Sequence, residues 1–216
     1  MTQQTASEPI IYQGQFGDFT ITPDDRTGVI VYRTGLMAAA LSFGIGSVLV
    51  LLDNSSTQLL TGLIACFYAA LGISLLTIHI YLAPLHRLLQ VFWLIGSVAT
   101  LALALSSSQP LAETVYNHPT ALLGVGFTFV ALTGIYFKEA FCFNRLETKI
   151  LTPLVPVLLL GHLVGILPVQ WERTLLAIWA VLFVVFALRK AVQQIPPDIG
   201  DKSVFSYLKE QRSAKA

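Results

Sequence analysis

Two histidines, His79 and His162, are the ionisable side chains that fall clearly inside the long apolar stretches of this 216-residue chain. Ionisable groups are costly in hydrocarbon, so each of the two marks a candidate site. Imidazole is an axial ligand of haem and of chlorophyll, which makes both residues candidate cofactor ligands. The alternative for His162, which we favour, is a neutral structural histidine that hydrogen-bonds to a neighbouring helix.

The stretch around His162 is the most irregular in the sequence. It carries two residue types that interrupt or loosen helices: Pro153, Pro156, Gly161, Gly165 and Pro168. Proline removes a backbone hydrogen bond and bends a helix. We expect His162 near the middle of the membrane and His79 near one surface, so a haem held by both is not expected. A small-molecule site, if there is one, is expected near His162.

Six apolar stretches must position these residues, at 34–52, 57–82, 88–105, 120–137, 150–168 and 174–188. Hydrophobic residues make up 55% of the chain and charged residues only 12%, about half the share in a soluble domain. A membrane-spanning helix needs about 20 apolar residues. The sequence therefore predicts an all-α bundle of six transmembrane helices over residues 34–188. Residues 1–33, with the start of the first helix, and the tail 189–216 are expected outside the membrane.

The distribution of basic residues predicts the orientation of this bundle. When the chain crosses back and forth at the six stretches, Arg173 is alone on its side among the 13 Lys and Arg residues. Loops that stay in the cytoplasm are rich in Lys and Arg, so both termini should be cytoplasmic, or stromal in a plastid. The basic face is expected against lipid headgroups, and its spread along a membrane surface does not fit nucleic-acid binding.

The segments outside the stretches carry their own signals. Residues 10–21 alternate loosely and contain two glycines, which favours a short strand pair or an extended segment. Thr22 is a good N-cap and Pro23 suits a first helical position, so the first helix should begin near Pro23 and continue to Leu52. Residues 203–212 are expected to form a short amphipathic helix.

Similar residues recur in the two halves of the chain. His79 and Trp93 in the first half resemble His162 and Trp179 in the second, in the same order. Six spans with both ends on one side can be two three-span halves of opposite orientation. The sequence thus raises the hypothesis of a 3+3 inverted repeat.

The connection 138–149 (KEAFCFNRLETK) combines charges with aromatic residues next to the fourth stretch. We expect an interfacial helix here. Aromatic residues and Arg are enriched in binding hot spots, so we predict an interaction surface formed by Lys138, Glu139, Phe141, Phe143 and Arg145. The alternative is membrane anchoring with local ion pairing.

Motifs for catalysis are missing from the sequence. It contains no Gly-x-Ser-Gly, no His-Glu-x-x-His, no paired glutamates within a stretch and no glycine-rich phosphate loop. Cys66 and Cys142 are expected at different depths, which disfavours a disulfide. We therefore expect a protein that is not an enzyme.

Two segments carry a resemblance to a known family. Residues 134–165 (GIYFKEAFCFNRLETKILTPLVPVLLLGHLVG) and residues 16–33 (FGDFTITPDDRTGVIVYR) are similar to a family of small integral membrane proteins of cyanobacteria and plastids. That family is a domain of unknown function. The resemblance implies a thylakoid or plasma membrane location, or a plastid membrane, and assigns no catalytic residue and no cofactor.

Three functions follow from these observations. The favoured one is a non-enzymatic accessory protein that docks on other integral membrane proteins, and the resemblance implies a photosynthetic complex during assembly or maintenance. The second is a small-molecule permease with its site near His162, although no Asp, Glu, Lys or Arg lies deep in a stretch. The third is a haem or chlorophyll carrier that uses His162.

Overall fold

The computed structural model describes residues 10–52 and 57–213. The chain starts with an antiparallel hairpin of β1 (Ile11–Gly14) and β2 (Gly17–Thr20), as the alternation of residues 10–21 predicts. The helix α1 (Pro23–Leu51) follows directly, with Thr22 as its N-cap and Asp25 completing a capping box. The expectations for residues 1–9 and for Lys215 fall outside the described residues.

Six helices in the described part of the chain are long and apolar enough to cross a bilayer. After α1 these are α2 (Thr57–Thr77), α3 (Ala83–Ser106), α5 (Leu122–Phe143), α6 (Leu146–Leu163) and α7 (Val169–Ala191). The short helix α4 (Leu111–Asn117) and the 3-10 turn η1 (Pro119–Ala121) connect α3 to α5. After α7 come α8 (Pro196–Ile199) and α9 (Ser203–Ser213), so the predicted tail helix is present.

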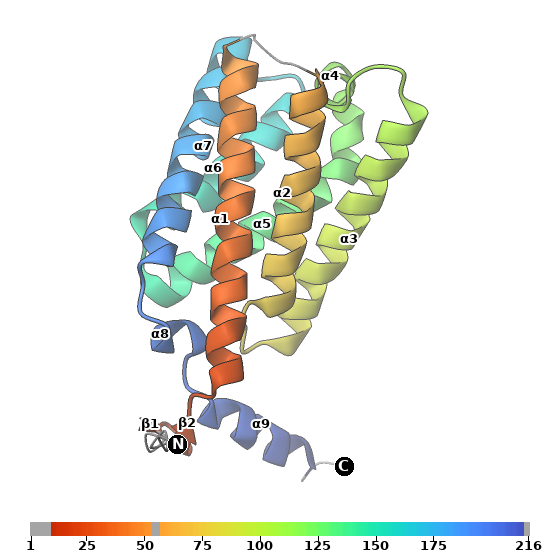
Figure 1. The fold of residues 1–216 in the computed structure, drawn as a ribbon. Coiled ribbons are helices and arrows are strands. Elements are labelled where there is room, and N and C mark those ends of the chain that lie inside the picture. The colour runs from red at the N-terminus through yellow and green to blue at the C-terminus, as the bar shows by residue number, and fades with distance from the viewer. Residues whose placement is uncertain (1–9, 53–56, 214–216) are drawn as a thin grey trace, which may run out of the picture.

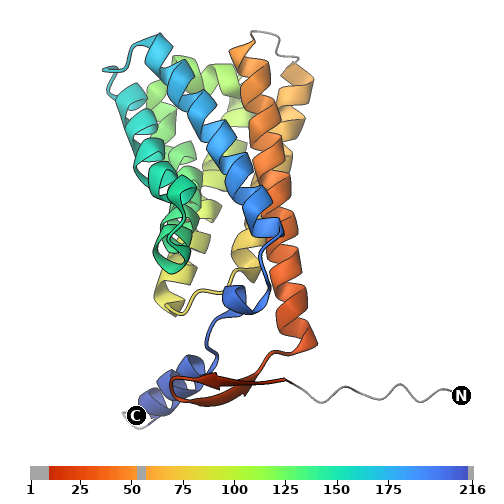
Figure 2. The same ribbon diagram turned by 90° about the vertical axis from the view of Figure 1, so that its left-hand side faces the viewer.

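The six long helices form a ring in chain order. Each packs against the next, from α1 through α2, α3, α5 and α6 to α7, which closes the ring on α1 (Figure 1). The hairpin and α9, where the described part of the chain begins and ends, lie below one end of the ring (Figures 1 and 2). We call this end basal and the opposite end distal. That the basal side is cytoplasmic stays a prediction.

Glycine permits close contacts between helices of the ring. A Cβ at Gly35 of α1 would lie 2.7 Å from the carbonyl oxygen of Ala70 in α2. A Cβ at Gly96 of α3 would lie 2.5 Å from the backbone nitrogen of Thr128 in α5. Small residues allow backbones to approach in lipid, where no hydrophobic force draws helices together.

The two halves of the ring are packed differently. The basal half is filled by large side chains that are almost fully buried, among them Leu36, Leu75, Ile135, Tyr136, Phe183 and Phe186. The distal half encloses a cavity instead. This difference in packing along the bundle axis positions the candidate site.

Several boundaries differ from the sequence prediction. Helix α2 ends at Thr77 rather than at 82, because an extended link reverses the chain before α3 begins at Ala83. Helix α6 begins at Leu146 and ends at Leu163, earlier at both ends than the predicted 150–168. The predicted interfacial helix at 138–149 is absent, because α5 continues to Phe143 and a left-handed Asn144 (φ 53°) turns the chain directly into α6.

Candidate functional site

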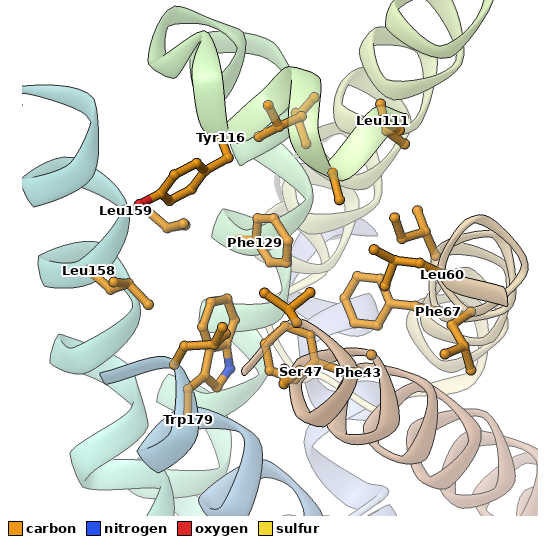
Figure 3. A pocket seen from close by; sticks show the side chains of 18 of the residues that line it. Phe43, Ser47, Leu60, Phe67, Leu111, Tyr116, Phe129, Leu158, Leu159 and Trp179 are labelled. Atoms are coloured by element: carbon orange, nitrogen blue, oxygen red, sulfur yellow. The ribbon is translucent and has the colours of Figure 1, made fainter. Parts of the chain in front are cut away.

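A cavity of about 490 Å³ occupies the distal half of the ring. Figure 3 shows side chains from α1, α2, α4, α5, α6 and α7 around it. Its wall is almost entirely apolar and aromatic. Representative lining residues are Phe43, Leu60, Phe67, Leu111, Phe129, Leu158, Leu159 and Trp179. Pockets of this size with few polar groups are typical of small-molecule sites.

Polar side chains gather at the distal mouth of the cavity. His162 lies in the last turn of α6, and its Nδ1 is 2.7 Å from Oε1 of Glu172 in the first turn of α7. The His162 Nε2 lies 3.2 Å from the carbonyl oxygen of Tyr116 in α4. The Tyr116 hydroxyl donates to Oε2 of Glu172 at 3.2 Å, and its ring stacks on the imidazole with centroids 5.0 Å apart. These three residues, which all line the cavity, form the distal triad.

Hydrogen bonds fix the orientation of the His162 ring. The Tyr116 carbonyl oxygen only accepts hydrogen bonds, so the His162 Nε2 donates to it, and the Nδ1 faces the Glu172 carboxyl group. The neighbouring Arg173 also lines the cavity and donates from Nη2 to the carbonyl oxygen of Leu51 in α1. The mouth thus joins α1, α4, α6 and α7.

A second polar point interrupts the apolar wall. The Tyr68 hydroxyl in α2 lies 2.5 Å from Oγ1 of Thr100 in α3, and both residues line the cavity. The indole Nε1 of Trp93 donates to the carbonyl oxygen of Tyr68 at 3.0 Å. These bonds hold α2 against α3, and they place two hydroxyl groups within reach of a bound molecule.

Aromatic rings close the cavity toward the basal half. Trp179 packs against Phe43 and Phe129, with ring centroids 4.5 Å and 5.3 Å away. Its indole Nε1 donates to the hydroxyl of Tyr136 at 3.2 Å. Tyr136 belongs to the packed basal half, so this floor separates the cavity from the basal end.

The basal end is sealed by buried charges. Lys190 of α7 is completely buried, and its Nζ is 2.7 Å from Oε2 of the equally buried Glu139 in α5. The same ammonium group contacts Oδ1 of Asp198 in α8. Arg33 of α1 binds the other oxygen of Asp198 at 2.6 Å, and the Tyr32 hydroxyl reaches Glu139 at 3.4 Å. We call these five residues the basal cluster.

Further contacts tie the basal cluster to the chain around it. The Arg33 guanidinium also donates to the carbonyl oxygens of Gln193 and Gln194, at 2.5 Å and 2.9 Å. The Lys190 ammonium lies over the ring of Phe143, 4.1 Å from the ring centroid. These contacts hold the connection between α7 and α8 against α1.

The structure corrects the depth of one of the two predicted histidines. His162 is at the distal mouth rather than at mid-membrane, because α6 ends at Leu163. His79 lies near one end of the bundle, as expected, although in the basal link between α2 and α3 rather than inside a helix. Both nitrogens of His162 already have oxygen partners, which gives an axial haem or chlorophyll ligand at this position little support.

The predicted interaction surface is split by the structure. Phe141 is exposed, but Glu139 is fully buried and belongs to the basal cluster. Lys138 is bound to Glu139 at 2.8 Å, and the Arg145 side chain is only 10% exposed. Phe143 lies under the Lys190 ammonium group. The expectation of a continuous exposed surface is corrected, because α5 extends to Phe143 and turns this segment into the bundle.

Sequence reasoning missed several residues of both sites. Glu172 and Tyr116 flank the apolar stretches, where charged and aromatic residues are ordinary, so no local signal marks them. Lys190 and Asp198 also lie just beyond a span, and their burial depends on α8 folding back under the ring. The order of apolar and polar segments in the sequence does not show that α8 folds back under the ring.

Comparisons with known proteins agree with a membrane bundle. No curated protein and no solved structure matches the chain. One family model matches residues 73–207, a range that covers α3 to α8 completely and includes the 134–165 segment but not the 16–33 segment. The match spans more than half of the chain, which therefore belongs to the family described as uncharacterized integral membrane protein (DUF2301).

Proposed function

We propose that this multi-pass membrane protein is a non-enzymatic protein that binds a small amphiphilic molecule in its distal cavity. The observation that carries the proposal is the combination of an apolar cavity of about 490 Å³ with a polar triad at one end. An apolar wall with a few convergent polar groups binds by burial and orients by hydrogen bonds. The sequence also led us to expect a small-molecule site near His162. The proposal keeps that site and locates it at the distal end of the bundle.

The chemistry of the wall defines the ligand class. Rings such as Phe67, Phe129 and Trp179 favour an apolar body. The distal triad favours a small head that exchanges hydrogen bonds with imidazole, carboxylate and phenol groups. A molecule of this kind partitions into the bilayer, so the membrane itself supplies it.

Binding can be measured through Trp179 in the cavity floor. The substitutions Trp93→Phe and Trp171→Phe leave Trp179 as the single indole. The probe is a brominated medium-chain fatty alcohol, because bromine quenches indole fluorescence on contact. We expect saturable quenching in detergent micelles.

A matched pair of variants on α1 distinguishes the cavity from the lipid-facing surface. Ser47 lines the cavity and is 5% exposed, whereas Ile45 is 50% exposed. Ser47→Phe fills the cavity and is expected to weaken quenching at least about tenfold, whereas Ile45→Phe leaves it unchanged. Quenching that does not saturate, or that survives Ser47→Phe, contradicts the proposal.

Docking on other membrane proteins is the second candidate. It is supported by Phe137 and Phe141, which stack at the basal end of α5 and are 57% and 83% exposed. If this role holds, the resemblance favours a photosynthetic complex in a thylakoid membrane as the client. Gentle solubilisation from the native membrane should then recover the protein with a partner, and Phe141→Ala should weaken that recovery. Recovery of the protein alone, at monomer size, counts against docking.

A further inference from the structure

The packing of the ring is hollow at one end and closed at the other. The distal cavity reaches down to Trp179, and below it large side chains such as Leu36, Ile135 and Phe183 are fully buried. The basal cluster then closes the ring with Lys190 and Glu139 completely out of contact with solvent. The cavity has exposed lining residues at its distal end, such as Tyr116 and Val169, and buried ones at its floor, which fits one state of an alternating-access carrier.

The seal is made of ion pairs, although ion pairs are an inefficient way to hold helices together. Desolvation of two charges roughly cancels their attraction, and apolar replacements are often as stable. When an ion pair separates, water hydrates the two charges and regains the desolvation cost. Apolar side chains that separate gain no such hydration. A sealed state and an open, hydrated state can therefore lie close in free energy.

The position of the cluster fits a gate between two halves of the ring. If the ring is divided into α1–α3 and α5–α7, the cluster crosses the division. Arg33 of α1 binds Asp198, just beyond α7. Tyr32 of α1 binds Glu139 of α5. The order of packing round the ring is also the one that two successive three-helix halves would give. Rocking of one half against the other would break these bonds first.

We infer that the protein transports the amphiphile bound in its distal cavity, and that the basal cluster is the closed gate of the transport path. The inference rests on the proposed function. Separation of Arg33 from Asp198 and of Tyr32 from Glu139 opens the basal half to water, while the cavity closes at the distal mouth. The hydrated charges stabilise the opened form.

Thiol accessibility tests the gate without any ligand. The substitutions Cys66→Ser and Cys142→Ser remove the native thiols. Both cysteines are exposed and lie outside the two sites. Ala39→Cys then places one thiol on α1 between the cluster and the cavity, at a position that is completely buried. In sealed vesicles, a charged, membrane-impermeant thiol reagent on the basal side should label this thiol slowly.

Leaving one charge of the cluster unpaired should open the gate. Asp198→Asn removes the carboxylate that contacts both Arg33 and Lys190, so the sealed form buries an uncompensated positive charge that water hydrates in the open form. We expect basal labelling of the Ala39→Cys thiol to accelerate at least about tenfold. Labelling of a Ser47→Cys thiol from the distal side should slow in the same background. Lys149→Gln, an exposed basal charge outside the cluster, is the control and should change neither rate.

A second variant keeps the test decisive. Glu139→Gln removes the carboxylate that pairs with Lys138 and Lys190, and it carries the same expectation if Asp198→Asn does not elute as a single symmetrical species. Unchanged labelling of the Ala39→Cys thiol in a variant that elutes in this way overturns the inference. The two failures are distinguishable, because loss of the gate leaves the quenching of Trp179 intact, whereas loss of the proposed function removes that quenching.

Discussion

The indole Nε1 of Trp179 donates to the hydroxyl of Tyr136 at 3.2 Å, across the boundary between the cavity and the packed basal half. Trp179 lines the cavity floor, and Tyr136 is completely buried below it. A ligand that displaces Trp179 therefore acts directly on the packing of the basal half.

A double-mutant cycle on Trp179 and Tyr136 should reveal this connection. Tyr136→Phe leaves the indole N–H without its partner and is expected to cost about 1–3 kcal/mol of folding stability. Combined with Trp179→Phe, the loss should be smaller than the sum of the single losses, because the pair then holds no unpaired polar group. The measurement is thermal unfolding in detergent, followed by size-exclusion chromatography. Additive losses would show that the bond contributes nothing.

The close approach of α1 and α2 at Gly35 should be sensitive to one methyl group. The nearest atom to a new Cβ is the backbone carbonyl oxygen of Ala70 in α2, which cannot rotate away. Gly35→Ala is expected to lower stability by about 1–3 kcal/mol. Gly62→Ala in α2, where nothing lies within 4 Å, is the control and should be neutral or stabilising. Equal effects of the two substitutions would contradict close packing as the role of Gly35.

The distal triad should determine how tightly the head of a bound amphiphile is held. His162→Ala removes the ring between Glu172 and Tyr116 and is expected to weaken binding of the brominated alcohol about tenfold. His118→Ala, an exposed histidine at the same end that does not line the cavity, should leave affinity unchanged. The comparison uses the Trp179 quenching titration. If both variants bind alike, the triad does not contact the head.

The spans could be predicted because their signal is local. Apolar length marks all six helices, and Thr22 with Pro23 fixes the start of α1. The sequence also favours a strand pair or an extended segment before α1, and it predicts a helix at residues 203–212. Each of these depends on residues within a few positions of one another, where capping, alternation and hydropathy act.

The two sites depend on contacts between distant segments. The ion pair of Lys190 joins residues 51 positions apart, and the pair of Arg33 joins residues 165 positions apart. The burial of Glu139 follows from the exact end of α5, which hydropathy does not define. A cavity requires the packing of six helices at once. The surface expected at 138–149 and the depth expected for His162 were wrong for this reason.

The half-buried His79 should make folding stability depend on pH. His79 lies in the link between α2 and α3, and its imidazole packs near Gly28 of α1. Burial lowers the pKa of His79 below the usual 6.5 and outweighs the opposite effect of the Asp25 carboxylate. Since the folded-state pKa is the lower one, the unfolded chain binds the proton more tightly. The stability contribution is therefore complete above pH 6.5 and is lost as the pH falls toward the folded-state pKa.

Substitution of His79 should remove this dependence on pH. The unfolding temperature in detergent is expected to fall between about pH 7 and about pH 5.5, and to fall less in His79→Gln, since glutamine takes up no proton. His118→Gln, at an exposed distal position, should keep the fall of the parent protein. Carboxylates with ordinary pKa values titrate mostly below this range. An identical slope in the parent and in His79→Gln would mean that His79 is protonated in both states or hydrated in the folded one.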